Sequence, residues 1–296
     1  MSFKSGFVAV VGKPNVGKST LINALLGRKV SIVSPKAQTT RNNIMGVLNN
    51  PDYQIVFIDT PGIHKSKNSL DKFMQKSIDT ATSDVDLLLY LLDGSREFDK
   101  SDIDTLSRYC TGNYPVFAVV NKIDTGSFES LYPKMAVLNT IPNLTAVYAI
   151  SSTTGKNLDL LLSGILDKLT DNVKYFPDDE YTDKDIYFTL AEIIREKMLW
   201  ILDDEIPHGV GVVIDNLEDN DNLSVVHATI FCERDSHKSI IIGNKGAMLS
   251  RIGTACREAM QKVLQKPVYL DLFVKVKPGW RDREGVISTL GYKDTK

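Results

Sequence analysis

Short apolar runs bounded by polar residues recur along the first part of the chain. They occupy residues 7–11, 53–58, 87–92, 114–120 and 147–150. A continuous apolar run of this length is typical of a buried strand. Residues 19–26 and 158–166 are predicted helices, so strands and helices alternate, and this alternation indicates an α/β domain.

The second part of the chain has a different pattern. Residues 190–199 carry apolar side chains at helical spacing, and residues 210–214 and 223–231 are predicted strands. A glycine loop then leads into a predicted helix at 247–264 and a last strand at 268–276. These elements are sufficient for a second small α+β domain.

A charged, proline-containing segment separates the two parts. Residues 176–184 have no apolar period and are predicted to be a linker. We therefore expect a first domain at residues 1–172 and a linker at 173–185. The second domain is expected at 186–296, with its core at about 202–280 and a C-terminal tail.

The segment between the first strand and the first helix matches the pattern G-x-x-x-x-G-K-S. In this pattern glycines let backbone N–H groups turn toward a β-phosphate, Lys18 reaches the β and γ oxygens, and Ser19 offers its hydroxyl to Mg²⁺. A strand, a glycine loop and a helix are the context that the motif needs. The predicted phosphate-binding residues are Gly12, Lys13, Pro14, Asn15, Val16, Gly17, Lys18, Ser19 and Thr20.

Two polar stretches could complete a metal site. Asp59 ends a predicted strand, where it can hold Mg²⁺ through water, and the N–H of Gly62 in the following D-T-P-G can meet a γ-phosphate. Of the two threonines in Q-T-T-R, we favour Thr40 over Thr39 as a further ligand. The predicted metal ligands are thus Ser19, Thr40 and Asp59 (via water), and the predicted catalytic groups are Lys18, Thr40 and Gly62.

The tetrapeptide N-K-I-D indicates which nucleotide base is bound. The carboxylate of Asp124 can accept two hydrogen bonds from the N1–H and exocyclic amine of guanine, donors that adenine does not present there. The motif therefore predicts GTP rather than ATP. The remaining predicted GTP-binding residues are Asp59, Thr60, Pro61, Gly62, Ile63, Asn121, Lys122, Ile123 and Asp124, with Ser151 and Ser152 after a later strand.

In this order, the motifs G-x-P-N-V-G-K-S, T-T-R, D-T-P-G, N-K-x-D and S-S-x-x-G resemble those of translation-factor-class P-loop GTPases, over roughly residues 5–170. The resemblance implies a mixed, mainly parallel sheet with helices on both faces, and nucleotide-sensitive switches around 39–41 and 59–70. Ile63 stands where Ras-like proteins carry the glutamine that orients the attacking water. Water must then be positioned by backbone, another side chain, a partner or a cation. By resemblance, Asn15 is a candidate K⁺ ligand; the alternative is that it only stabilises the loop.

Composition and cysteine content narrow the setting. The chain has 296 residues, of which 43% are hydrophobic and 24% charged, enough for two ordinary domains. Its three cysteines are odd in number and widely spaced, which disfavours a disulfide framework or a zinc site and favours a reducing cytoplasm. We expect no signal-type segment before the first strand, and the longest apolar run, 87–92, is too short to span a bilayer.

Charge is segregated in the second domain, although the chain as a whole carries a formal charge of −2. Residues 203–233 contain eight acidic residues and no Lys or Arg, whereas residues 234–283 contain eleven basic and four acidic residues. The basic excess surrounds the glycine loop and predicts a groove for a polyanion. The alternative is a solvated helix face.

The glycine loop is G-N-K-G. Two glycines let a sugar-phosphate backbone approach closely, and Lys245 adds a cation. The order helix, strand, strand, helix, G-x-x-G, helix, strand resembles a type II KH domain, which binds single-stranded RNA. Trp280 is expected in the core rather than stacked on a base. The predicted RNA-binding residues are Gly243, Asn244, Lys245, Gly246 and Arg251.

A GTPase domain followed by a type II KH domain, with Y-F-P-x-D in the linker and K-P-G-W near the end, resembles the bacterial Era family of the TrmE-Era-EngA-like group. The resemblance implies slow hydrolysis of GTP to GDP with Mg²⁺, and binding of the single-stranded 3′ region of small-subunit (16S-type) rRNA during assembly of the small (30S) ribosomal subunit. It also implies a cytoplasmic monomer with peripheral contact to the inner face of the cell membrane.

Three other classes stay open. A metabolic P-loop kinase or ATPase would lack the guanine-selecting Asp124. A non-catalytic RNA-binding module would retain nucleotide without turnover. A peripheral membrane signalling GTPase would share the nucleotide site.

Overall fold

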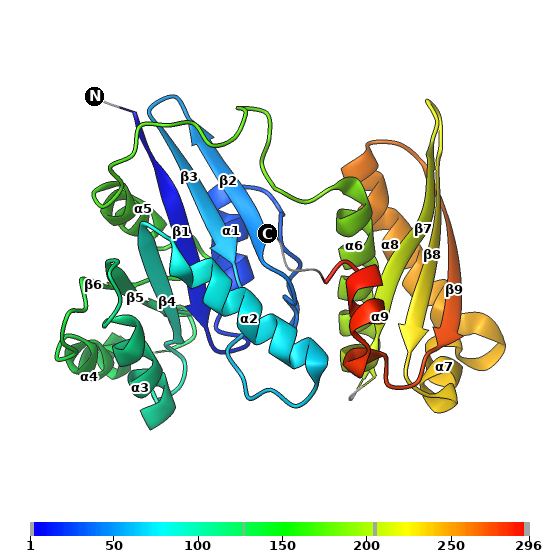
Figure 1. Ribbon diagram of the computed structural model, residues 1–296, viewed down its shortest axis with the longest axis horizontal. Coiled ribbons are helices and arrows are strands. Elements are labelled where there is room, and N and C mark those ends of the chain that lie inside the picture. Colours follow the sequence, from blue (N-terminus) through cyan, green and yellow to red (C-terminus); the bar gives the residue numbers. More distant parts are fainter. Residues whose placement is uncertain (1–2, 127, 204–205, 293–296) are drawn as a thin grey trace. The chain divides into compact units, whose positions relative to one another are not determined.

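The structure, a computed structural model, describes residues 3–126, 128–203 and 206–292 (Figure 1). These residues form two compact units. The first comprises the described residues of Met1–Val33, Thr40–Lys65 and Met74–Asp183. The second comprises those of Ser34–Thr39, Ser66–Phe73 and Lys184–Lys296. Two short segments of the first predicted domain thus belong to the second unit, and the predicted tail residues 293–296 lie outside the described part.

The first unit is built on a six-stranded sheet with the order β2-β3-β1-β4-β5-β6. All neighbouring strands run parallel except β2, which is antiparallel to β3. Every residue of β4 is buried, as its apolar run predicts. The strands are β1 (Lys4–Gly12), β2 (Ile44–Asn50), β3 (Tyr53–Asp59), β4 (Leu87–Asp93), β5 (Val116–Asn121) and β6 (Ala146–Ala149).

Helices cover both faces of this sheet. One core contains residues of α1 (Lys18–Leu26) and α5 (Leu158–Leu166). The other contains residues of α2 (Ser69–Ser83), α3 (Lys100–Tyr109) and α4 (Phe128–Leu138). The predicted α/β class, with a mainly parallel sheet between two helical layers, is confirmed. The carboxyl ends of β1, β3, β4 and β5 meet at one edge, where a doubly wound sheet binds its ligand.

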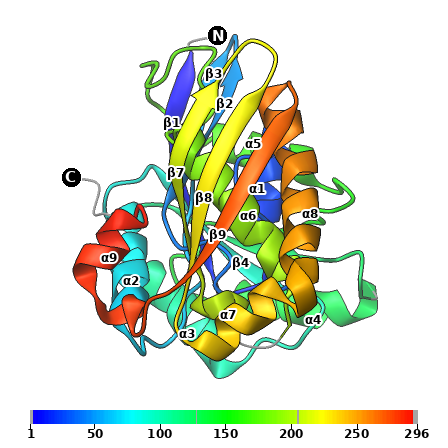
Figure 2. The same cartoon turned by 90° about the vertical axis from the view of Figure 1, so that its right-hand side faces the viewer.

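The second unit contains a three-stranded sheet with the order β7-β8-β9, in which β7 is antiparallel to β8 and β8 is parallel to β9. Buried and partly exposed residues alternate strictly along β8, so only one face of the sheet belongs to the core. Figure 2 shows the opposite face, with α6 and α8 behind the sheet. The elements are α6 (Ile186–Ile201), β7 (Gly211–Asp219), β8 (Ser224–Cys232), α7 (Asp235–Ile242), α8 (Ala247–Leu264), β9 (Val268–Val276) and α9 (Glu284–Thr289).

Trp280 belongs to the core of the second unit. Its side chain is fully buried, and its Nε1 donates a hydrogen bond to the carbonyl of Gly209 at 2.9 Å. The expectation of a core role is confirmed.

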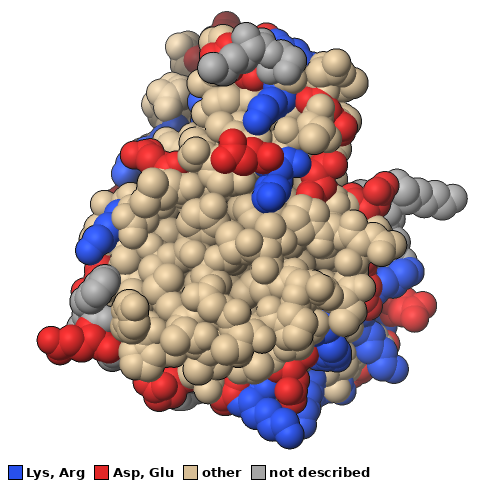
Figure 3. Space-filling view, turned by 90° about the vertical axis from the view of Figure 1, so that its left-hand side faces the viewer, with Lys and Arg blue, Asp and Glu red and all other residues tan. Residues whose placement is uncertain are grey.

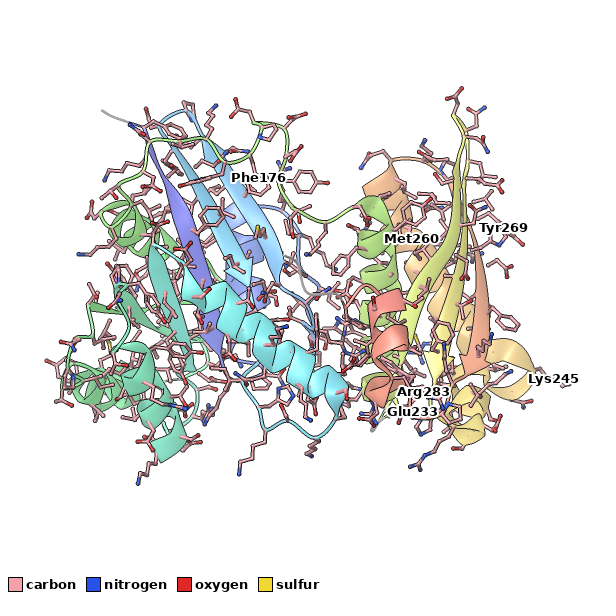
Figure 4. The ribbon with its side chains drawn as sticks, in the orientation of Figure 1. Phe176, Glu233, Lys245, Met260, Tyr269 and Arg283 are labelled. Carbon is pink, nitrogen blue, oxygen red and sulfur yellow. The ribbon has the colours of Figure 1, made fainter. Side chains whose placement is uncertain are left out.

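The predicted linker is bound to β2 and β3. Gln54 Oε1 accepts hydrogen bonds from the backbone N–H groups of Tyr175 and Phe176 at 2.7 and 3.0 Å, and Gln54 Nε2 donates to the carbonyl of Phe176, labelled in Figure 4. Near the end of the linker, the N–H of Met45 donates to Asp183 Oδ1 at 2.8 Å. The linker is therefore fixed to the first unit as far as Asp183.

One side of the first unit carries little charge. Residues 135–155 contain no Lys, Arg, Asp or Glu. Figure 3 views the side on which β6, α4 and α5 are labelled in Figure 1, and it shows a broad area without charged side chains. Val137 of α4 and Leu160 of α5 are exposed apolar residues. Within the described residues, every helix is too short or too polar to cross a membrane.

Candidate functional site

The phosphate loop joins β1 to α1 and depends on its glycines. Gly12 has a φ of 152°, and a Cβ there would lie 2.6 Å from the carbonyl oxygen of Leu91. Gly17 has a φ of 99°, and a Cβ there would lie 2.3 Å from Asn121 Nδ2. Side chains at either position would push the loop away from its neighbours. The loop can therefore present its backbone N–H groups and the α1 N-terminus to an anion.

Lys18 lies inside this loop. Its Nζ donates to the carbonyls of Gly12 and Lys13, each at 3.1 Å. Burial lowers the pKa of Lys18 to about 8, while the nearby Asp59 carboxylate acts in the opposite direction. The β and γ phosphates of a nucleotide would stabilise this buried ammonium, since they would supply the anionic oxygens that solvent cannot.

Three predicted metal ligands lie together. The Ser19 hydroxyl donates to Asp59 Oδ2 at 2.7 Å, and the Thr40 hydroxyl lies 3.2 Å from the same oxygen and 3.0 Å from the Ser19 hydroxyl. Thr39 instead donates its hydroxyl to the carbonyl of Lys36. The structure therefore places Thr40, and not Thr39, beside Asp59.

Asp59 has the environment of a cation site. It is fully buried, and its Oδ1 has no hydrogen-bond partner among the described residues. Burial raises the pKa of Asp59, whereas the hydrogen bond from Ser19 and the charge of Lys18 lower it. A buried carboxylate oxygen without a partner is costly unless a cation is bound there. Two hydroxyls and one carboxylate fit Mg²⁺, which keeps several waters and takes further oxygens from nucleotide phosphates. The described residues contain no group of three or more His, Cys, Asp and Glu that could hold a metal.

The D-T-P-G segment packs tightly on the phosphate loop. A Cβ on Gly62 would lie 2.8 to 2.9 Å from atoms of Pro14, two of them backbone atoms. The N–H of Ile63 donates to the carbonyl of Gly12 at 3.0 Å, and the Thr60 hydroxyl donates to the carbonyl of Val10 at 2.8 Å. The Ile63 side chain is partly buried against the core of α2, α3 and α4. It contributes no polar atom that could orient water.

Asn121 joins the phosphate loop to the loop after β6. Its Nδ2 donates to the carbonyl of Val16 at 2.9 Å, while its Oδ1 accepts from the N–H and the hydroxyl of Ser152 at 3.0 and 2.9 Å. The neighbouring Ser151 hydroxyl accepts from the N–H of Thr154. Asn121 thus positions loops on two sides of the nucleotide site.

Asp124 is exposed, as a side chain that hydrogen-bonds a bound base must be. The N–H of Ile123 donates to the carbonyl of Ile150 at 3.3 Å, which fixes the motif to the strand end before Ser151. The exposed Asp124 is accessible to a ligand at this strand end.

Carboxylates between the end of β4 and the first turn of α3 form ion pairs with two lysines of the site, and sequence reasoning missed them. Lys122 Nζ lies 2.7 Å from Asp93 Oδ2, and Lys13 Nζ lies 2.7 Å from Asp99 and 3.0 Å from Asp102. The hydrogen bond from Lys13 lowers the pKa of Asp99 well below its usual range. The sequence did contain a signal for these carboxylates, because Asp93 ends a strand at the ligand-binding edge and Asp99 caps the N-terminus of α3.

The G-N-K-G loop lies between α7 and α8. Gly243 and Gly246 have φ angles of 73° and 81°, and Lys245 between them has a φ of 49°. A Cβ on Gly243 would lie 2.7 Å from Met248 Cβ, whereas one on Gly246 would meet open space. Gly243 is thus needed for both space and conformation, and Gly246 for conformation alone. Asn244, Lys245 and Arg251 are exposed, and Figure 4 shows Lys245 projecting from the loop.

Family models match both parts of the chain. A family described as 50S ribosome-binding GTPase matches residues 7–122, and the KH domain family matches residues 205–281. GTPase Era of Clostridium kluyveri is 45% identical over 291 residues, which cover 98% of this chain and 99% of that protein. The chain belongs to the GTPase Era family. GTPase Era of Halothermothrix orenii, another Era-family relative, is 42% identical over 99% of this chain and its own full length.

Two solved structures of Era resemble this Era-family chain over its whole length. One is Era in complex with MgGDPNP and nucleotides 1506–1542 of 16S ribosomal RNA, at a TM-score of 0.94 and 40% identity, covering 98% of this chain and 99% of that chain. The other is a tyrosine-to-alanine variant of Era from Aquifex aeolicus bound to GDP and AlF4⁻, at a TM-score of 0.94 and 39% identity, with the same coverage.

Proposed function

We propose that this Era-family protein hydrolyses GTP and binds the single-stranded 3′ region of small-subunit rRNA through its KH domain, and so assists assembly of the small ribosomal subunit. The observation that carries the proposal is the match, over 98% of the chain, to Era bound to both MgGDPNP and a 16S rRNA fragment. The geometry of both sites supports it, because each site brings together the elements that its ligand needs.

The chain passes directly from the metal site of the first unit into the second unit, which supports control of RNA binding by GTP. Thr40 lies beside Asp59 in the first unit, and the preceding Thr39 belongs to the second unit. There the buried Arg195 of α6 donates to the carbonyls of Thr39 and, at 3.4 Å, Gln38, while it pairs with Glu192. Ordering of Thr40 by Mg²⁺ and GTP would therefore bias residues 34–39, which pack in the RNA-binding unit.

The coupling has a direct test. The double substitution Arg195→Met/Glu192→Met removes the bonds to residues 38–39 without leaving a buried, unpaired charge. We expect RNA affinity to differ less between the GTP-analogue and GDP states in this variant than in the wild type. An undiminished difference would reject the coupling.

Hydrolysis at this site is expected to be slow. Mg²⁺, when bound, would neutralise charge that develops on the phosphates. Lys18 would neutralise phosphate charge, Thr40 and Ser19 would bind the metal, and the N–H of Gly62 would donate to the γ-phosphate. Ile63 orients no water, so a cation or another group must do so. K⁺ bound through Asn15, a residue with a φ of 63° on the phosphate loop, is our candidate. Equal turnover rates in Na⁺ and K⁺ would eliminate it.

Guanine selection rests on Asp124. Asp124→Asn would replace one acceptor oxygen by a donor facing the guanine amine. We expect GTP affinity to fall by about a hundredfold or more and xanthosine triphosphate affinity to rise, measured by competition with a fluorescent GDP. Retained preference for GTP would reject the assignment, and wild-type preference for ATP would favour a kinase or ATPase.

RNA binding rests on the G-N-K-G loop. The double substitution Asn244→Asp/Lys245→Asp should abolish binding of single-stranded RNA while GTP binding survives. The matched control is Gln261→Asp/Lys262→Asp, which makes the same change of charge at exposed positions near the other end of α8. Similar losses in both variants would indicate general electrostatics rather than a clamp.

The remaining properties follow from family resemblance. We propose a cytoplasmic monomer with peripheral contact to the inner face of the cell membrane; co-sedimentation with anionic lipid vesicles tests the contact, and analytical ultracentrifugation tests the monomer. Absence of turnover with saturating RNA, Mg²⁺ and K⁺ would instead favour a non-catalytic nucleotide-binding module. Vesicle binding that depends on GTP, without RNA binding, would favour a membrane signalling GTPase.

A further inference from the structure

The outer face of the β7-β8-β9 sheet carries two large, mostly exposed aromatic side chains. Tyr269 and Phe273 of β9 are 56% and 62% exposed. They alternate with residues that face the core, and Figure 2 shows their side of the sheet in front of α6 and α8. Of the two, Phe273 lies toward the carboxyl end of β9, on the same face as Lys275.

Three lysines gather around the carboxyl ends of β8 and β9. Lys238 Nζ of α7 lies 6.0 Å from the ring centroid of Phe273, and Lys277 Nζ lies 5.3 Å from that of Phe231. Lys275 stands opposite Phe231 in the parallel register of β8 and β9. We call Phe231, Phe273, Lys238, Lys275 and Lys277 the lysine–aromatic platform.

Three acidic groups near the platform have other partners. Asp271 lies 3.3 Å from His227, and Asp215 accepts from the Thr229 hydroxyl at 2.7 Å. Glu233 is paired with Arg281 at 2.8 Å. No carboxylate in the described part of the chain lies within ion-pair distance of the three platform lysines. Their charges are therefore available to an anionic ligand.

The helix that carries one platform lysine leads directly into the G-N-K-G loop. Lys238 lies on α7, whose last residue directly precedes Gly243. Figure 4 shows Lys245 and Tyr269 on the same side of the second unit. A KH loop clamps only about four nucleotides, so a longer RNA must leave the clamp over neighbouring surface.

We propose that RNA held by the G-N-K-G loop continues onto the lysine–aromatic platform, where Phe273 and Phe231 stack on unpaired bases and the three lysines contact phosphates. Aromatic side chains flanked by cations on an open sheet suit single-stranded nucleic acid, because every base offers a flat face and every linkage a negative charge. A second copy of the chain fits less well, since a two-fold interface at this patch would bring like-charged lysines together. The inference rests on the proposed RNA binding.

The test compares RNA lengths on the full chain saturated with Mg²⁺ and a GTP analogue. One single-stranded probe has about six nucleotides, enough for the clamp, and the other extends it by about eight at each end. We expect Phe273→Ala to weaken binding of the long RNA by about tenfold or more and to leave the short RNA unaffected. The matched control is Tyr269→Ala, an exposed aromatic on the same strand and face but four residues before Phe273, toward the end of β9 away from the platform lysines, which should bind both RNAs as the wild type does.

Salt dependence tests the lysines separately. In the triple variant Lys238→Gln/Lys275→Gln/Lys277→Gln, the slope of log affinity against log salt should fall by about two for the long RNA, given about 0.7 per phosphate contact on a single strand. The platform would be overturned if Phe273→Ala weakened both RNAs equally or had no effect. It would also be overturned if Phe273→Ala and Tyr269→Ala had equal effects. A changed oligomeric state with unchanged RNA affinity would overturn it as well, and would make this face an interface between copies. Failure of the wild type to bind either RNA would instead reject the proposed function.

Discussion

Asn121→Ala should destabilise the first unit far more than its small change of volume suggests. Asn121 is 2% exposed, and its side chain makes three hydrogen bonds, to Val16 and twice to Ser152. Alanine leaves two buried backbone groups without partners, the carbonyl of Val16 and the N–H of Ser152. At about 1–3 kcal/mol for each, the free energy of unfolding of this unit should fall by about 4 kcal/mol. Nucleotide affinity should fall as well, since both loops border its site.

The two tryptophans of the chain make the assay selective. Trp200 and Trp280 both belong to the second unit, so their fluorescence reports its unfolding, whereas circular dichroism reports both units. In urea titrations, Asn121→Ala should shift the dichroism transition of the first unit and leave the tryptophan transition unchanged. The control Asn139→Ala makes the same chemical change at an exposed position and should cost less than about 0.5 kcal/mol.

A double-mutant cycle identifies the bonds responsible. Ser152→Ala removes only the hydroxyl and should cost about 1 kcal/mol, and this cost should vanish in the Asn121→Ala background. The reasoning is refuted if the two costs add, if Asn121→Ala costs no more than Asn139→Ala, or if the tryptophan transition moves equally.

Three further outcomes are expected. Gly62→Ala places a Cβ 2.8 to 2.9 Å from Pro14, so it should weaken binding of a GTP analogue about tenfold more than binding of GDP. The control Gly285→Ala, with open space at its Cβ, should leave the ratio of the two affinities unchanged. Equal losses for both nucleotides would contradict the role of the Gly62 N–H. Trp280→Phe loses a buried hydrogen bond and should lower the unfolding free energy of the second unit by about 1–3 kcal/mol, followed through Trp200 fluorescence; an unchanged value would contradict its core role. The three buried cysteines are Cys110, Cys232 and Cys256, and burial raises the pKa of the Cys256 thiol to about 12. At pH 8 a thiol reagent should therefore modify these cysteines only as fast as the protein unfolds. A rapid reaction of the native protein would be inconsistent with this burial.

The elements that the sequence predicted well are those with uniform surroundings. The run at 87–92 is apolar throughout because β4 is central and buried on both faces, and the structure extends it by one residue. No element was predicted at 44–50, where β2 pairs with a single strand at the sheet edge and ends in asparagines. Nor was one predicted at 128–138, where Pro133 lies inside α4. Edge strands and surface helices bury only part of their residues, so their patterns are weaker.

The sequence by itself determined the chemistry that depends on neighbours in the chain. Glycines at 12, 17, 243 and 246 must allow unusual backbone angles, and the order of the motifs placed a phosphate site at strand ends. The sequence favoured Thr40 over Thr39, and only the tertiary structure shows that Thr40 lies beside Asp59, which is distant in the sequence. The roles of Asn121, of the carboxylates between the end of β4 and α3, and of the lysine–aromatic platform likewise depend on contacts between separate strands and loops. Such contacts leave no local pattern, because each residue meets its partner only after the chain has folded.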